Sequence, residues 1–232
     1  WRNGDRVQER LSYERGLTAD PGYVPLLVNL GHSYLSEKRY DEALGYYNEA
    51  ISLSPGESVA WYNSGLIYRK LGKTDDANHC WKMFLKDNRI GGKAFRAVDR
   101  LNAQGDFTYR VYQIGPRRVI VNQNILLSES VRQEEAAREL APLRTLLMLN
   151  RNIDLEVVVF VANDLEAARQ RVSDIKKMIV PESSTELQRR IRLSWFDKPE
   201  SVKLPGGQQV EQEEGILFFG YAGPGKVEEI SI

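Results

Sequence analysis

The sequence is poor in the residues that build disulfides and metal sites. Its 232 residues include a single cysteine, Cys80, which excludes an internal disulfide framework and leaves no second thiol for a zinc site. The two histidines, His32 and His79, have no Asp or Cys arrangement around them beyond the neighbouring Cys80. No stretch is apolar enough to span a bilayer. We therefore expect no metal and no transmembrane segment in this chain.

Net charge is also missing. The 32 Lys and Arg residues balance the 32 Asp and Glu residues, so no global field attracts nucleic acid or an anionic membrane. Nucleic acid is therefore disfavoured as a partner. A hydrophobic content of 42% with 28% charged residues is ordinary for a globular protein, and the length allows two domains. Because the chain begins with Trp1 and not with Met, we expect the natural protein to extend upstream.

Recognisable catalytic motifs are lacking as well. No Ser-His-Asp or paired-carboxylate arrangement stands out. Gly220 followed by Gly225 and Lys226 has the spacing of a phosphate-binding loop, but Val227 replaces the hydroxyl residue that reaches magnesium. Too few residues follow for the helix that holds the phosphates. We predict that the chain is not an enzyme and binds no cofactor.

What the sequence does contain is a repeat. Residues 24–57 and 58–91 share one pattern of small and aromatic residues at an offset of 34 residues. The first copy has Leu30, Gly31, Tyr34, Ala43, Tyr47 and Ala50, and the second has Ser64, Gly65, Tyr68, Ala77, Trp81 and Phe84. The small residues fall where two antiparallel helices approach closely, with aromatic side chains beside them. Each copy is thus expected to be a helical hairpin.

This pattern resembles the tetratricopeptide repeat family, as do Trp61, Gly72 and Pro55 at that family's spacing. Residues 1–23 resemble the second helix of a preceding repeat. Phe84 and Arg89 depart from the usual small residue and proline, and residues 92–104 carry an apolar stripe on one helical face, which predicts a capping helix. The resemblance implies a helical solenoid over residues 1–105.

In that family the first helix of each repeat lines a concave face that binds proteins or peptides. The resemblance therefore places a peptide-binding face in this chain, where amides could bind a peptide backbone and a basic pair could hold a carboxylate. Asn is common at its position in such repeats, so a purely structural role stays open. The predicted peptide-binding residues are Asn29, His32, Tyr62, Asn63, Arg69 and Lys70.

After residue 105 the pattern changes to alternating strands and helices. We expect an α/β sandwich with one mixed sheet, its helices on one face. The expected strands are residues 107–114, 117–123, 155–162, 188–196 and 215–221. Two helices are expected. The first is long and starts at Ser128 or Ser130, and its apolar stripe consists of Val131, Ala137, Leu140, Leu143, Leu147 and Met148. The second covers residues 165–179, and its apolar stripe includes Leu165. Residues 199–214 are expected to form a loop.

This order of elements resembles the C-terminal domain of outer-membrane-protein-A-like proteins, with residues 124–147 like its first strand end and long helix. In that family an Asp and an Arg grip the peptidoglycan stem peptide, and the matching positions are Asp164 and Arg169. Residues 161–164 replace the family's Gly-His-Thr-Asp-like run, and the loop after the Asp is missing. Two alternatives stay open: Asp164 caps the following helix, or the domain over residues 106–232 has kept the fold and lost the ligand.

Taken together, these resemblances imply a non-enzymatic scaffold of the bacterial cell envelope. Its repeats would bind a protein or peptide, and its second domain would dock to peptidoglycan or to a protein. That hypothesis places the protein in the periplasm or at the outer membrane. The alternative is a cytoplasmic tetratricopeptide adaptor whose α/β domain serves dimerisation or regulation. The short junction near residues 102–106 predicts that the two domains keep a fixed relation.

Overall fold

A computed structural model of the chain describes residues 3–128, 130, 132–180 and 184–222. Contacts within the chain divide it into two compact units, Trp1–Ala97 and Val98–Ile232. Each is described by itself below. The division lies inside the helix Gly92–Asn102, before the predicted boundary at residue 105.

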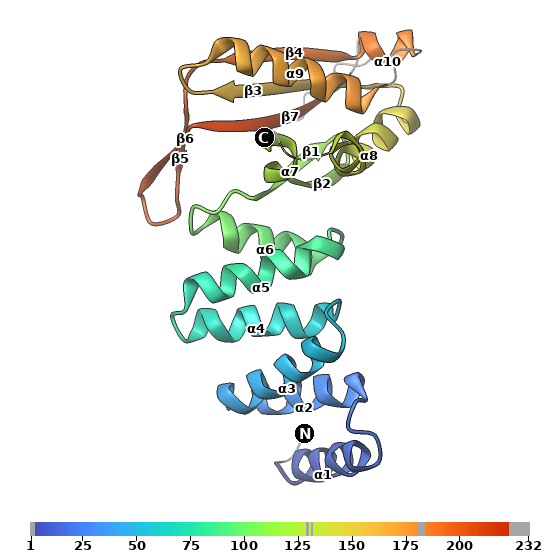
Figure 1. The fold of residues 1–232 in the computed structure, drawn as a ribbon, viewed down its shortest axis with the longest axis vertical. Coiled ribbons are helices and arrows are strands. Elements are labelled where there is room, and N and C mark those ends of the chain that lie inside the picture. The colour runs from blue at the N-terminus through green and yellow to red at the C-terminus, as the bar shows by residue number, and fades with distance from the viewer. Residues whose placement is uncertain (1–2, 129, 131, 181–183, 223–232) are drawn as a thin grey trace. The chain divides into compact units, whose positions relative to one another are not determined.

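Unit 1 is built of helices that follow one another along the chain (Figure 1). The helices α2 and α3 form the hairpin predicted for residues 24–57, and α4 and α5 form that predicted for residues 58–91. A further helix precedes these hairpins, as expected, and α6 begins where the capping helix is predicted. The bounds are α1 Asn3–Ala19, α2 Val24–Ser36, α3 Tyr40–Leu53, α4 Ser58–Lys70, α5 Thr74–Asp87 and α6 Gly92–Asn102.

The small residues of the repeat allow the close helix contacts that the pattern predicts. A Cβ placed on Gly31 would lie 2.5 Å from the ring of Tyr47, and one on Gly65 would lie 2.4 Å from the indole nitrogen of Trp81. Tyr47 and Trp81 are fully buried. In each hairpin the aromatic ring of the second helix therefore occupies the space where the first helix has no side chain.

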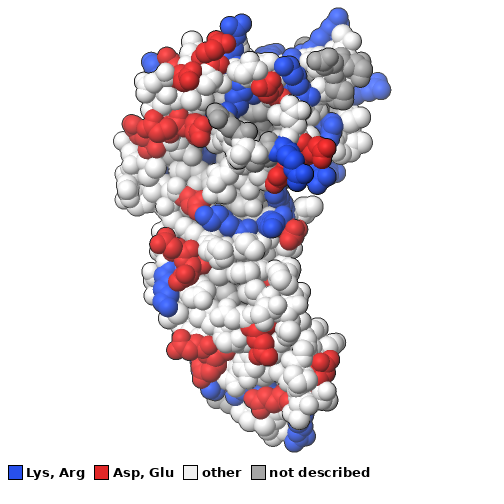
Figure 2. Space-filling model, in the orientation of Figure 1, with Lys and Arg blue, Asp and Glu red and all other residues white. Residues whose placement is uncertain are grey.

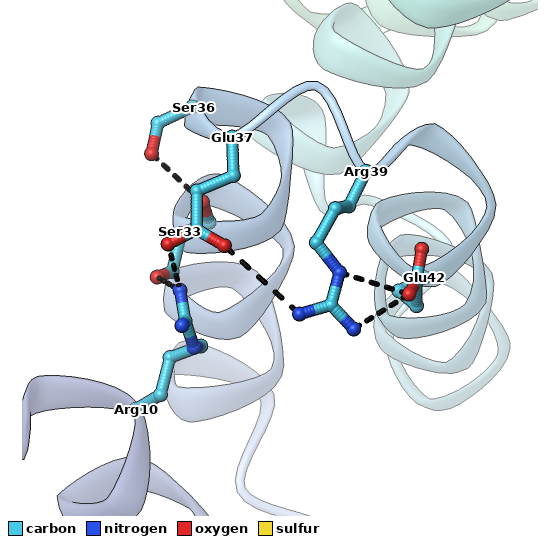
Figure 3. Close-up of polar contacts among 6 residues, drawn as sticks. All are labelled: Arg10, Ser33, Ser36, Glu37, Arg39 and Glu42. Carbon is cyan, nitrogen blue, oxygen red and sulfur yellow. Dashed lines mark hydrogen bonds and ion pairs between the residues drawn. The ribbon is translucent and has the colours of Figure 1, made fainter. Parts of the chain in front are cut away.

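A polar network joins the first three helices (Figure 3). Arg10 of α1 donates to Ser33 Oγ at 3.2 Å and to Glu37 Oε1 at 2.5 Å, and Glu37 lies at the end of α2. Arg39 binds Glu42 in the first turn of α3, and its guanidinium lies 4.5 Å from the centre of the Tyr34 ring. Charge-assisted bonds at partly buried positions are stronger than exposed ones, so this network fixes α1 against the first hairpin.

Unit 2 contains strands and helices in alternation (Figure 1). Its strands are β1 Tyr109–Ile114, β2 Arg117–Asn122, β3 Ile153–Val161, β4 Ile191–Phe196, β5 Glu200–Lys203, β6 Gln209–Gln212 and β7 Glu214–Ala222. Its further helices are α7 Gln123–Leu127, α8 Gln133–Leu149, α9 Leu165–Ile179 and α10 Thr185–Arg189. The predicted mixture of strands and helices is thus present.

The predicted mixed sheet is present, but the prediction that it is the single sheet of this unit is wrong. The described residues form three sheets: the hairpin β1–β2, the mixed sheet β4–β3–β7, and the hairpin β5–β6. In the mixed sheet β4 runs parallel to β3, and β7 runs antiparallel to it. Its core face holds Leu155, Val157 and Val159 of β3 against the apolar stripes of α8 and α9. The β3–α9–β4 crossover explains why two strands are parallel.

Several element predictions need correction. Residues 199–214, expected to be a loop, contain the hairpin β5–β6, and residues 188–189 lie in α10 and not in a strand. The residues following Asn122 form the short helix α7, where the resemblance placed a strand end, and α8 begins only at Gln133. Met148 and Leu165, expected on apolar stripes, are 62% and 50% exposed. Val131 and the residues 225–227 lie outside the described part of the chain.

A side chain closes one edge of the mixed sheet. The amide of Gln123 bonds both backbone groups of Ile216 in β7, each at 2.9 Å, and thereby imitates a neighbouring strand. Tyr112 of β1 donates to the same Ile216 carbonyl at 2.6 Å. Burial of Tyr112 raises the pKa of its phenol, so the hydroxyl stays protonated as a donor.

Candidate functional site

The structure places the six predicted peptide-binding residues on two helices of unit 1. Asn29 and His32 lie on α2, and Tyr62, Asn63, Arg69 and Lys70 lie on α4. Asn29, His32, Arg69 and Lys70 are exposed, whereas Tyr62 and Asn63 are buried. We call the exposed surface of these two helices, with its buried neighbours, the α2–α4 face.

Asn63 joins the two repeats at this face. Its Nδ2 atom lies 2.6 Å from Nε2 of His32 in the preceding repeat and donates to Tyr47 Oη at 3.2 Å. Asn63 is only 7% exposed, and the His32 and Tyr47 rings meet edge to face. The amide nitrogen of Asn63 is therefore engaged within the protein. Binding of a peptide backbone by Asn63 stays a prediction, and Asn29 is the exposed amide at the equivalent position of the first repeat.

The surroundings of His32 favour its neutral form. Part of its side chain is exposed, but partial desolvation where the ring packs against its neighbours lowers its pKa, the charge of Lys93 lowers it further, and Glu57 acts in the opposite direction. Because the amide nitrogen of Asn63 can only donate, Nε2 of His32 accepts and the proton of the neutral ring lies on Nδ1. The α2–α4 face thus combines the His32 ring, held by Asn63, with the exposed amide of Asn29.

Tyr62 directly precedes Asn63 in α4 and packs inward. Its ring lies 5.1 Å from that of Phe84, and the ammonium of Lys93 lies 5.6 Å from the ring centre. These three residues border a cavity of about 260 Å³, which also reaches Ser58 and Ile90. The side chain of Ile90 is 92% exposed at its rim. Tyr62 is therefore a wall of a small cavity and not an exposed ligand.

Arg69 and Lys70 form the last turn of α4, and both are exposed. Cations at the carboxyl end of a helix are favoured by the helix dipole, so the pair is compatible with a structural role. Two adjacent exposed cations also attract a carboxylate of a bound chain. The α2–α4 face thus combines uncharged hydrogen-bonding groups with a basic end.

The two residues predicted to bind peptidoglycan are not brought together as a pair. Asp164 caps α9, since its carboxylate accepts from the backbone nitrogen of Ala167 at 2.8 Å. Arg169 is exposed and lies 3.8 Å from Glu166 one turn away. Both positions have a local structural explanation, and peptidoglycan binding stays a prediction.

Other classes of site find no support in the described part of the chain. No group of three or more His, Cys, Asp or Glu side chains there is arranged to hold a metal ion. The helices among those residues are too short or too polar to cross a membrane. Figure 2 shows small acidic and basic patches scattered over each unit between uncharged areas. Cys80 is buried, and burial raises the pKa of its thiol to about 12, so it stays protonated.

Comparison with known proteins identifies the repeats. Residues 24–57 match one family model described as a tetratricopeptide repeat, and residues 46–77 match a second. The chain contains tetratricopeptide repeats. Such repeats are typically scaffolds for contacts between proteins and not enzymes, and the α2–α4 face belongs to the repeat region. The outer-membrane-protein-A-like resemblance of the second unit is not supported by these matches.

The similar proteins are otherwise diverse. Protein bimA of Emericella nidulans is 31% identical over 84 residues, covering 36% of this chain. Protein O-mannosyl-transferase TMTC3 of Homo sapiens is 30% identical over 98 residues, covering 41% of this chain. The chain spans only 10% and 11% of the lengths of these curated relatives.

Two solved structures show a limited similarity to this chain. A tetratricopeptide repeat protein from Parabacteroides merdae is 15% identical, with a TM-score of 0.41, 75% of this chain covered and 52% of the other. The structure titled MamA MSR-1 C2 is 22% identical, with a TM-score of 0.38, 44% of this chain covered and 60% of the other.

Sequence reasoning missed three contributors to the α2–α4 face. Tyr47 supplies a hydrogen-bond partner from α3, and Lys93 and Glu57 set the charge around His32. The repeat pattern assigns Tyr47 to packing alone. Lys93 and Glu57 lie at the start of α6 and at the N-cap of α4, where the repeat pattern marks only helix ends.

Proposed function

We propose that the α2–α4 face binds an extended polypeptide segment of a partner protein, so that the chain acts as a scaffold. The observation that carries this proposal is the arrangement around Asn63. Its buried amide fixes the neutral ring of His32 at 2.6 Å, with the exposed amide of Asn29 one turn away on α2. Fixed uncharged donors and acceptors suit a peptide backbone, which offers one N–H and one C=O per residue.

The basic end of the face gives the bound chain a direction. Arg69 and Lys70 follow Asn63 by about two helical turns on α4. An acidic side chain or a terminal carboxylate of the partner would be attracted there, while the backbone lies over Asn29 and His32. Charged groups of this kind contribute to the association rate and to specificity more than to affinity.

Peptide selection tests this proposal without a known partner. A phage library of random peptides is selected against the full chain, and the affinity of the selected peptides is measured for wild type and variants. Asn29→Ala and Lys70→Glu are expected to weaken binding about tenfold each, the loss of about 1.4 kcal/mol. Lys86→Glu, at an exposed position on α5, is the matched control and should leave affinity unchanged.

A further inference from the structure

The two edges of the mixed sheet in unit 2 differ. On the outer edge of β7, Gln123 bonds both backbone groups of Ile216. On the outer edge of β4, one side chain among the described residues bonds an outward backbone group: the ammonium of Lys176 donates to the carbonyl of Ile191 at 3.2 Å. The strand contains no proline, and its pairing with β3 continues without a bulge from Ile191 to Phe196. Such an edge is a template for pairing with another strand.

The pairing of β3 with β4 determines which backbone groups face outward. Leu155 of β3 donates to the carbonyl of Arg190 at 2.9 Å, which sets the phase of the parallel ladder. By the alternation of that ladder, the backbone groups of Arg192 and Ser194 face β3. The backbone groups of Ile191, Leu193 and Trp195 face away from β3. The hydrogen bond from Lys176 to the carbonyl of Ile191 agrees with this direction. Three residues therefore offer an evenly spaced row of donors and acceptors.

We propose that β4 pairs antiparallel with β4 of a second copy of this chain, about a two-fold axis at Leu193. This register pairs only residues whose backbone groups face outward. In this register Leu193 lies opposite Leu193 of the second copy, and Ile191 lies opposite Trp195 of the second copy. All of these side chains lie on one face of the sheet. Trp195 is 38% exposed and would be covered by the partner. The mixed sheet would thereby double from three to six strands across the interface.

The charges on the other face of the sheet fit the same register. It sets Arg192, which is exposed, opposite Ser194 of the second copy. The carboxylate of Glu156 accepts from the hydroxyl of Ser194 in β4 at 2.5 Å and from that of Tyr221 in β7 at 2.7 Å. These hydrogen bonds lower the pKa of that carboxyl, and the charge of Arg192 of the same chain, which lies opposite Glu156 in the ladder, helps to lower it. In the proposed register Arg192 of each copy also comes within reach of Glu156 in the other, as a second cation beside that carboxylate. Two symmetry-related pairs of opposite charge make the edge complementary to itself and select a second copy over an unrelated strand.

Sedimentation velocity on the full chain over a range of concentrations tests the proposal. The wild type is expected to show a concentration-dependent species of twice the 26.5 kDa chain mass. Arg192→Glu is expected to raise the dimer dissociation constant at least tenfold, since it replaces the cation beside Glu156 of both its own chain and the second copy. Arg117→Glu, an exposed position on β2, is the matched control and should leave the constant unchanged. Adding Glu156→Arg to Arg192→Glu exchanges the charges and should restore association.

Leu193→Pro tests the backbone pairing itself. Proline at this position removes an outward N–H and leaves the bonds to β3 intact, as is tolerated on edge strands. The variant should sediment as a monomer while keeping the wild-type far-ultraviolet circular dichroism. If it does not fold, the Arg192 series decides. A wild type that stays monomeric at all concentrations overturns the proposal, and so does a dimer that is indifferent to Arg192→Glu. The outcome is independent of peptide binding by the repeats.

Discussion

Asn63 and His32 lie on successive repeats, and their side-chain nitrogens are 2.6 Å apart. The contact ties α4 to α2 across the helix α3 that separates them in sequence. The same amide bonds Tyr47 of α3. One buried side chain therefore connects three helices, and the shape of the α2–α4 face depends on it.

Asn63→Ala should destabilise unit 1. The substitution leaves the hydroxyl of Tyr47 and a ring nitrogen of His32 without this partner, and loss of such buried bonds costs about 1–3 kcal/mol. Urea unfolding followed by circular dichroism measures the change. Asn29→Ala, at the equivalent exposed position of the first repeat, is the control and should change stability by less than about 0.5 kcal/mol. Equal effects of the two substitutions would refute the structural role of Asn63.

Gly65→Ala should destabilise the second hairpin. The added Cβ would lie 2.4 Å from the indole nitrogen of Trp81, which is fully buried, so the ring or its helix must shift. Overpacking of this kind costs about 1–3 kcal/mol. Gly45→Ala is the opposite case, because nothing lies within 4 Å of the added Cβ on α3. Removing a helical glycine there should stabilise by about 0.5–1 kcal/mol. Thermal unfolding of both variants checks the difference in sign.

Stability of the repeats should fall in mild acid because of His32. Its pKa in the folded state is lowered from 6.5, mainly by burial, so the unfolded chain takes up the proton first as pH decreases. The free energy of unfolding therefore decreases as pH falls from above 6.5 toward the folded pKa. Below that value the loss stays constant. His32→Gln should reduce this dependence, and His79→Gln should leave it in place. Urea unfolding at several pH values between pH 5 and pH 8 measures this dependence. A pH dependence in His32→Gln equal to that of the wild type would contradict the assignment to His32.

Asp164→Ala should cost about 0.5–2 kcal/mol, the usual value of a lost helix N-cap. Arg169→Ala should leave stability unchanged, because the side chain is exposed and its ion pair with Glu166 is long. Co-sedimentation with purified peptidoglycan sacculi separates the structural role from the predicted ligand. If wild type co-sediments and both variants do not, the peptidoglycan prediction holds. If wild type does not co-sediment, the cap is the whole role of Asp164.

The repeats were predictable because their signal lies within short stretches of sequence and occurs twice. Gly31 and Tyr47 recur as Gly65 and Trp81, and each pair reports one helix contact. The second unit offered no such repetition. The hairpin β5–β6 has few apolar residues, since its strands include Glu200, Gln209 and Gln212, so alternation gave no signal. The three separate sheets depend on contacts distant in sequence, such as that of Gln123 with Ile216, which no local pattern reveals.

The candidate site was predictable only in part. Position within the repeat placed Asn29, His32, Arg69 and Lys70 on exposed surface of two neighbouring helices. It could not separate Asn63 from Asn29, which occupy the same repeat position, because the burial of Asn63 depends on the ring of Tyr47 and on His32. Nor could it place Lys93 near His32, since that proximity depends on the packing of α6.

The central claim is that the α2–α4 face is where this chain binds a polypeptide. The most direct measurement is the affinity of phage-selected peptides for wild type, Asn29→Ala and Lys86→Glu, determined by isothermal titration calorimetry. The account predicts about tenfold weaker binding for Asn29→Ala, about 1.4 kcal/mol, and wild-type affinity for Lys86→Glu. Selected peptides that bind wild type and Asn29→Ala equally, or a selection that enriches none, would contradict it.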